Sequence, residues 1–283
     1  MHPSVFRYGI RLAGLVLFGA LPLAAQDSPP GYLQIFREEV KPGRAGSHVI
    51  TEAGWPRAFA KAKMKNYYIA MTAVYGPPEA WFMEGHESMA ELEESNKAIE
   101  SAPGLTAELD KLAQADAANI SGARGLLGRF RAELSNPGKV DVAKTRVWEV
   151  LVFQVRPGHE ADFNEAAKLY KSTVEQGKID FPWATYEVLA GMPGPVYLVF
   201  LPHLTLTEVD PATGVGAQLG KAFTEEAQKK LSSLAEGYTS VEDIVFTVSP
   251  QMSYMSDEFV ARDPKFWTRK PPAAKKQTAS VSQ

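Results

Sequence analysis

The stretch VRPGHEADF at residues 155–163 has a close counterpart, VKPGRAGSH, at residues 40–48. In each stretch an apolar, strand-like run ends at a valine, Pro-Gly turns the chain, and a helical pattern follows. VRPGHEADF begins 115 positions after VKPGRAGSH in the chain. A turn of this kind recurs by chance, so its meaning depends on whether the flanking segments recur with it.

The flanking segments do recur, in the same order. YIAMTAVYG (68–76) falls on WATYEVLAG (183–191) at the same spacing, and both end in glycine. Further along, the spacing grows to 118, where LLGRF (126–130) falls on IVFTV (244–248). Collinear similarity across four strand-like segments indicates a tandem duplication.

Each copy has the element order β-α-β-β-α-β. After the second Pro-Gly turn, apolar residues recur at helical spacing, namely Phe163, Ala166, Ala167, Tyr170 and Val174. The second helical region is interrupted at SAPG (101–104) and at DPATG (210–214). The strands are apolar on both faces, so both faces need cover. The sequence therefore predicts an α+β protein with two ferredoxin-like βαββαβ repeats. Their antiparallel sheets pack face to face or close into a barrel, with the helices outside.

This pattern resembles the dimeric α+β barrel superfamily, in particular its antibiotic-biosynthesis-monooxygenase-like and NIPSNAP-like branches. The V-x-P-G turn that opens an amphipathic helix carries the resemblance, together with the split second helix. The resemblance covers residues 31–135 as the first repeat and 145–255 as the second, with 136–144 as a linker. Superfamily members usually pair two such units as a homodimer. The resemblance implies that one chain supplies both here, as a monomeric pseudo-dimer or as a homo-oligomer.

The two ends of the chain differ from the repeats. Arg7 and Arg11 precede the short apolar run LAGLVLFGAL (12–21), and small residues follow it, which is typical of a signal peptide over residues 1–25. We therefore expect export to a bacterial periplasm or medium, without a stable membrane anchor after cleavage. Residues 263–283 are rich in proline and lysine and predict a disordered basic tail.

Composition excludes several functional classes. A net charge of only −3 gives no reason to expect a nucleic-acid partner. The absence of cysteine excludes disulfides, cysteine-ligated zinc, iron–sulfur clusters and thiol catalysis. The five histidines show neither H-x-x-H nor H-E-x-x-H spacing, so no metal site is predicted. No cofactor is predicted either, with haem as the alternative.

Histidines follow the third strand of both copies, at His86 and His203. A serine or threonine two residues later, with glutamate three residues beyond that, predicts a helix-capping box at each place. The alternative is proton transfer or ligand binding, since histidine titrates near neutral pH. His48 aligns with Phe163 on the packed face of the first helix, where it is a buried structural residue or a ligand-binding one. His159 is interpreted as a turn residue that faces solvent.

Polar residues also interrupt the strands, with Gln34 aligned to Glu149 and Thr72 aligned to Glu187. A buried, unpaired carboxylate is costly, so each glutamate is a candidate catalytic base or a partner in an ion pair at the surface. Gln34, Thr72 and His48 are candidate ligand-binding residues. Tyr68 and Trp183 are the aromatic candidates for a ligand pocket, although aromatic residues on strands more often fill a core.

Two functions remain open at this point. One is an exported barrel of unassigned activity that binds a small apolar or aromatic ligand between its sheets. The other is a monooxygenase-like or haem-handling oxidative enzyme that uses the same pocket, as the resemblance implies. Because this fold hosts many unrelated activities, the choice between them depends on the site and not on the fold.

Overall fold

A computed structural model describes residues 28–210, 212 and 214–268 of the chain, and the predicted signal peptide lies outside them. The first repeat contains β1 (Tyr32–Val40), α1 (Ala45–Glu52), α2 (Gly54–Lys61), β2 (Tyr68–Tyr75), β3 (Glu79–His86), α3 (Met89–Ser101), α4 (Leu105–Asp116) and β4 (Ile120–Phe130). The second contains β5 (Val147–Val155), α5 (Glu160–Gly177), β6 (Ala184–Ala190), β7 (Val196–His203), the 3-10 turn η3 (Leu206–Val209), α6 (Gly214–Ala222), α7 (Glu225–Leu234) and β8 (Tyr238–Val248). Two short helices follow, α8 (Asp257–Ala261) and α9 (Pro264–Trp267).

The repeated Pro-Gly turns adopt the conformation that makes glycine necessary. Gly43 has a φ of 75° and Gly158 a φ of 90°, in a region that side chains with a Cβ rarely enter. A helix starts directly after each turn, as the sequence predicts. In the first repeat this helix breaks after Ala53 into α1 and α2. A Cβ at Gly54 would run into the side chain of Leu112 on α4, so the glycine allows the two helices to approach closely.

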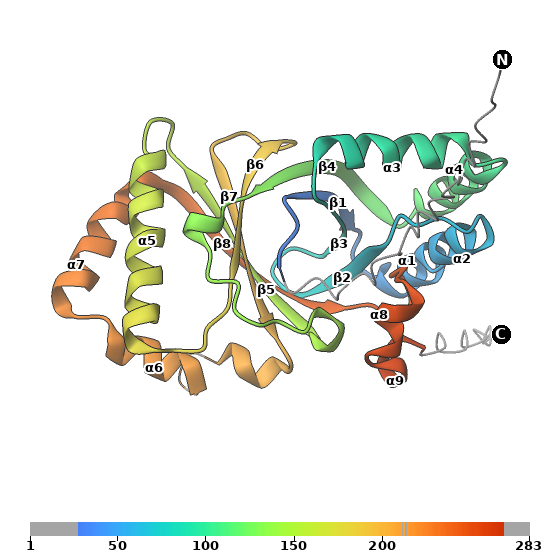
Figure 1. Cartoon of the computed structure of the whole chain (residues 1–283). Helices are drawn as coiled ribbons and strands as arrows, with labels where there is room; N and C mark the ends of the chain where they lie inside the picture. Colours follow the sequence, from blue (N-terminus) through green and yellow to red (C-terminus); the bar gives the residue numbers. More distant parts are fainter. Residues whose placement is uncertain (1–27, 211, 213, 269–283) are drawn as a thin grey trace, which may run out of the picture.

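The eight strands form one closed barrel in the order β1-β3-β2-β8-β5-β7-β6-β4, and all neighbours are antiparallel. Each repeat supplies four consecutive strands, and the pairs β2–β8 and β4–β6 join the two sheets. The helices lie outside, with α1 to α4 on one side of the barrel and α5 to α7 on the other (Figure 1). Of the two arrangements that the sequence allowed, the structure therefore has the closed barrel.

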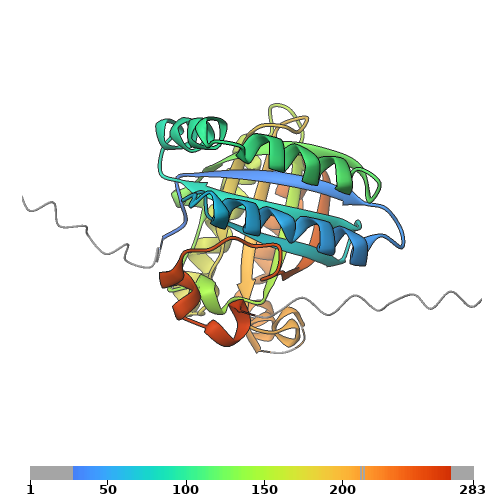
Figure 2. The same ribbon diagram turned by 90° about the vertical axis from the view of Figure 1, so that its right-hand side faces the viewer.

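Side chains from all eight strands fill the interior of the barrel. None of the core residues there is more than 9% exposed, and they are Leu33, Ile35, Met71, Trp81, Met83, Leu126, Val150, Val152, Tyr186, Val196, Leu198, Phe200, Ile244 and Phe246. Because side chains alternate along a strand, the residues between these point outward to the helix layer. Figure 2 shows the helices of the first repeat lying across the outer face of its sheet.

One charged pair lies among the inward-facing positions. The guanidinium of Arg37 on β1 forms an ion pair with Glu79 on β3, and both side chains are buried. The indole N–H of Trp81 donates to the other oxygen of Glu79 at 2.8 Å. The carboxylate is thus held by two donors, which is what a buried charge requires.

After β8 the chain returns to the first repeat and covers the linker. Arg146 forms an ion pair with Asp263, and the indole N–H of Trp267 donates to the carbonyl of Ala143 at 2.9 Å. Residues 264–267 are therefore helical and packed, unlike the disordered tail that the sequence predicts from residue 263, because Trp267 is buried. Residues 269–283 lie outside the described residues. Within the described part of the chain, no helix has the length and apolarity needed to cross a membrane.

Candidate metal centre

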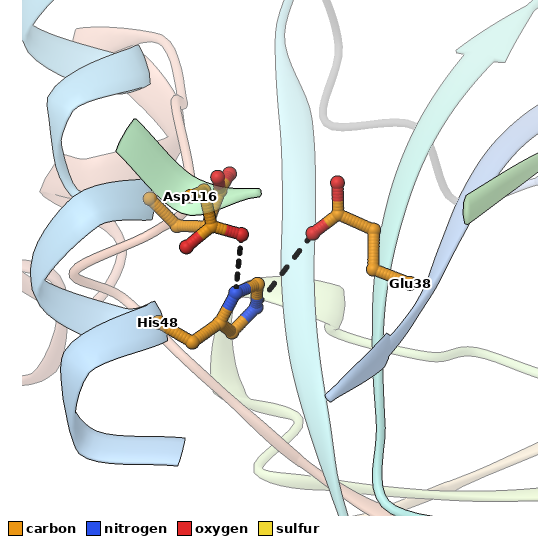
Figure 3. A group of neighbouring side chains, drawn as sticks. Glu38, His48 and Asp116 are labelled. Carbon is orange, nitrogen blue, oxygen red and sulfur yellow. Dashed lines mark hydrogen bonds and ion pairs between the residues drawn. The ribbon is translucent and has the colours of Figure 1, made fainter. Parts of the chain in front are cut away.

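Four ionisable side chains gather between the first sheet and its helices. Glu38 comes from β1, His48 and Glu52 come from α1, and Asp116 is the last residue of α4. One nitrogen or oxygen atom from each of them lies within 4.8 Å of those from the others. Figure 3 shows Glu38 and Asp116 approaching the imidazole of His48 from opposite sides.

Local structure explains why these residues meet. His48 and Glu52 are four residues apart on one face of α1, so both point in the same direction. On β1, Ile35 and Arg37 point into the barrel, so the alternation of the strand turns Glu38 outward beneath α1. The end of α4 then brings Asp116 to the same place.

Neighbouring polar groups hold Asp116 in position. Its Oδ2 lies 2.9 Å from Nδ1 of His48, and its Oδ1 accepts from Nδ2 of Asn119 at 2.8 Å. Asn119 in turn accepts from Ser47 Oγ at 2.7 Å and lies 3.3 Å from Thr51 Oγ1. Both oxygens of Asp116 therefore have partners, and α1 and α4 are tied together around it.

Two atoms of the cluster have no hydrogen-bond partner. His48 is 1% exposed, and its Nε2 is unpartnered at 3.7 Å from Oε2 of Glu38, which is also buried and has no hydrogen bond. Leaving a buried donor or acceptor unsatisfied costs about 1–3 kcal/mol. Such atoms in a folded protein call for an explanation, and a bound ion is one of the usual ones.

The buried carboxyl groups of the cluster repel one another when they are charged, and burial adds to the cost of ionising them. Burial, followed by the charge of Asp116, raises the pKa of Glu38 to about 7. Burial, followed by the charges of Glu38 and Asp116, raises the pKa of Glu52 to about 9. In the absence of a cation, the raised pKa of Glu52 favours its protonated form at neutral pH. A divalent ion would supply the missing positive charge.

The second repeat lacks this cluster altogether. The corresponding positions are Phe153, Phe163, Ala167 and Leu234. Phe163 stacks on Tyr197 with ring centroids 4.0 Å apart, and Phe153 packs against Phe163 at 5.2 Å. The same sheet–helix contact is thus stable when built from apolar residues alone. The polar cluster of the first repeat is not something that the fold requires.

The structure places the other predicted site residues on the outer face of the barrel too. His86 on β3 and His203 on β7 point outward from strands that are four places apart in a ring of eight, so they do not meet. His203 Nε2 lies 3.1 Å from Oε2 of Glu149, and His86 Nε2 lies 3.8 Å from the carboxylate of Glu84. Burial, then the neighbouring Glu149, raises the pKa of Asp243 to about 6.

The capping box predicted after His86 is present in modified form. Ser88 Oγ accepts from the backbone N–H of Glu91 at 3.2 Å, as a helix cap does. The carboxylate of Glu91 accepts from the backbone N–H of Glu87 at 2.7 Å, one residue before the position that the motif predicts. After His203, Glu208 accepts from the backbone N–H of Leu204 at 2.8 Å, but Thr205 makes no side-chain cap and a 3-10 turn follows it, so only half of the predicted box is present there.

The remaining candidates are separate from one another. Glu187 forms ion pairs with Arg129 and Arg131. Gln34 and Thr72 point outward from β1 and β2. Trp183 is buried and donates its indole N–H to the carbonyl of Leu134 at 2.8 Å, whereas the hydroxyl of Tyr68 is buried without a hydrogen-bond partner.

Of the four residues in the cluster, only His48 was predicted from the sequence as a candidate site residue. Two signals pointed to the others. The spacing from His48 to Glu52 places a histidine and a carboxylate on one helical face. The alignment of the repeats also pairs His48 with Phe163, and Glu38 two positions before Val40 with Phe153. No local sequence pattern indicates Asp116. This residue lies 64 positions after Glu52, at the end of a different helix.

No protein-family model and no curated protein sequence matches the chain. Solved structures do share its fold. An anthrone oxidase-like protein aligns at a TM-score of 0.50 and 11% identity over 77% of this chain and 92% of its own. A candidate monooxygenase from Lactobacillus acidophilus NCFM aligns at 0.46 and 7% identity, over 80% of this chain and 99% of its own.

A mutant chlorite dismutase from Candidatus Nitrospira defluvii aligns at a TM-score of 0.47 and 10% identity, over 83% of this chain and 96% of its own. At such identities these likenesses concern the fold and not the activity. The chain therefore has the dimeric α+β barrel fold, with both ferredoxin-like units supplied by a single chain.

Proposed function

We propose that this protein binds one divalent first-row transition-metal ion between the first sheet and the helices α1 and α4. The observation that carries the proposal is the buried Nε2 of His48, which makes no hydrogen bond and lies 3.7 Å from Oε2 of Glu38, an oxygen that also makes none. A cluster of acidic residues alone would not support a metal site. A buried imidazole nitrogen aimed into that cluster does, because neutral imidazole is a common metal ligand.

The donor atoms narrow the choice of metal. Three carboxylates and one imidazole offer oxygen and nitrogen but no sulfur, which does not suit Cu⁺. Ca²⁺ and Mg²⁺ prefer all-oxygen ligands, so the histidine favours Mn²⁺, Fe²⁺, Co²⁺ or Zn²⁺. The raised pKa values of Glu38 and Glu52 fit this assignment, since an ion at this place would offset the repulsion between the carboxylates.

The interior of the barrel offers less support for a ligand site. Ligand pockets typically have volumes of about 300 Å³ or more. Buried apolar side chains from all eight strands occupy the interior, with six partly buried residues packed against them. The polar cluster outside the barrel therefore supports a function better than the interior does, where the sequence suggested a small apolar ligand or a haem-handling oxidative enzyme.

Metal titration of the untagged, full-length protein tests the proposal. The protein is stripped with EDTA, incubated with Zn²⁺, Mn²⁺ or Co²⁺, desalted and analysed for metal content. We expect one ion per chain for at least one of these metals, and loss of that ion in His48→Ala.

His203→Ala is the matched control, because His203 is also a buried histidine on the outer face and lies 3.1 Å from a glutamate. This variant should retain the ion. Failure of the unmodified protein to keep any of the three metals would contradict the proposal, as would equal loss of metal in the two histidine variants.

A further inference from the structure

We infer that Glu38, His48 and Glu52 are the ligands of the ion and that Asp116 is a positioning residue, so that the ion keeps coordination positions open for an exchangeable small oxygen or nitrogen ligand. The inference rests on the proposed metal site and decides which kind of site it is. Structural zinc sites are closed by four protein ligands, whereas catalytic ones have three and an open position.

The hydrogen bonds distinguish Asp116 from Glu38 Oε2 and His48 Nε2. Its Oδ2 lies 2.9 Å from His48 Nδ1, and its Oδ1 accepts from Asn119 at 2.8 Å, so both oxygens are already engaged. By contrast, Oε2 of Glu38 and Nε2 of His48 have no hydrogen-bond partner. The atoms available to a cation therefore belong to Glu38 and His48, with Glu52 beside them.

The contact with Asp116 also fixes which nitrogen of His48 faces the cluster. A carboxylate at Nδ1 favours the tautomer with the proton on Nδ1, which leaves a lone pair on Nε2. Histidines that bind metals usually donate their other ring N–H to a carboxylate or a carbonyl in this way. Asp116 thus occupies the place of the orienting carboxylate, and Asn119, Ser47 and Thr51 hold it there.

Exposure indicates where the open positions lie. The side chain of Glu38 is 19% exposed, whereas those of His48 and Asp116 are almost completely buried. The cluster is therefore least deeply buried at Glu38, whose carboxylate lies across the imidazole from Asp116 (Figure 3). An exchangeable ligand of the ion would enter from that side.

Cobalt spectroscopy of the whole protein tests this assignment, because the visible bands of Co²⁺ report its ligand set. In Asp116→Asn we expect one bound Co²⁺ with unchanged band positions and an affinity about 10- to 100-fold weaker, as for other residues that orient a ligand. In Glu52→Gln the bands should shift or disappear. A band shift in Asp116→Asn as large as that in Glu52→Gln would overturn the inference and make Asp116 a ligand.

A second measurement needs no variant. Azide added to the cobalt-loaded unmodified protein should shift the visible bands, because it occupies an open position. Unchanged bands at saturating azide would show a closed site and overturn the inference, while one ion per chain would leave the proposed function intact. Absence of cobalt binding to the unmodified protein would instead overturn the proposed function, and this inference with it.

Discussion

Asp116 holds one ring nitrogen of His48 and leaves the other free. Nδ1 lies 2.9 Å from Oδ2 of Asp116, while the buried Nε2 has no hydrogen-bond partner. A histidine that served only to fill the core would have no need of a carboxylate at one nitrogen and an unsatisfied acceptor at the other. The arrangement therefore supports the proposed metal site, in which Asp116 orients His48 as a ligand.

The metal-free protein should lose stability as the pH rises. The folded-state pKa of Glu52 is raised to about 9, far above the ordinary value of 4.5, so the folded protein holds a proton that the unfolded chain releases. The stabilisation is complete at pH values below the ordinary pKa and is lost as the pH rises toward about 9. Urea unfolding of EDTA-treated protein should show a fall of about 1 kcal/mol per pH unit from about pH 6 to pH 8.

Glu52→Gln is the control for that pH dependence, because it keeps the shape of the side chain and removes its titration. Its unfolding free energy should vary less with pH over the same range, apart from the contribution of Glu38. An identical slope in the variant and the unmodified protein would assign the pH dependence to other groups.

A bound metal should stabilise the fold. An ion that binds only the folded state adds about 2.7 kcal/mol at a free concentration one hundred times its Kd. For a chain of this size, that amounts to a rise in Tm of about 5–10 °C. Differential scanning calorimetry with and without Zn²⁺ or Mn²⁺ checks this, and the rise should be absent in His48→Ala. An equal rise in that variant would place the stabilising ion elsewhere.

A histidine at the matching position of the second repeat should not create a metal site. Phe163→His removes the stack on Tyr197, whose ring centroid lies 4.0 Å away, and buries an imidazole without a carboxylate partner. We expect a loss of about 2–4 kcal/mol in unfolding free energy. We also expect no second bound ion, and a second equivalent of metal would show that the fold alone provides the site.

The ion pair inside the barrel should matter much more than a similar pair at its rim. Glu79→Ala leaves Arg37 buried without its partner, and breaking such a pair costs about 3–5 kcal/mol. Glu39→Ala is the control, because Glu39 pairs with Arg124 and both side chains are 44% exposed. That change should cost about 1 kcal/mol or less. Equal losses in urea unfolding would contradict the burial argument.

The fold could be predicted because the sequence contains two copies of the same βαββαβ pattern. The Pro-Gly turns require positive φ at Gly43 and Gly158, and this requirement preserved a recognisable marker in each repeat. Closure of the barrel could not be predicted from the sequence. No local sequence pattern specifies that β2 pairs with β8 and β4 with β6. Because the strands carry apolar residues on both faces, the sequence indicated only that both faces of each sheet would be covered.

The site was harder to predict than the fold. The sequence favoured His86 and His203 as candidate catalytic residues, but they lie on opposite sides of the barrel. Asp116 lies 68 residues after His48 and meets Glu38 and His48 only through packing of β1, α1 and α4. A residue-by-residue comparison of the repeats would have found more, because His48 opposite Phe163 marks a place where the copies differ in chemistry.

The most direct test is a crystal structure of the cobalt-soaked protein with anomalous data collected above the cobalt absorption edge. The proposal predicts one strong anomalous peak about 2.0–2.2 Å from Nε2 of His48, bounded by the carboxylates of Glu38 and Glu52. No peak should lie near Phe163. A water molecule at Nε2 of His48, with cobalt bound only at surface carboxylates or not at all, would contradict it.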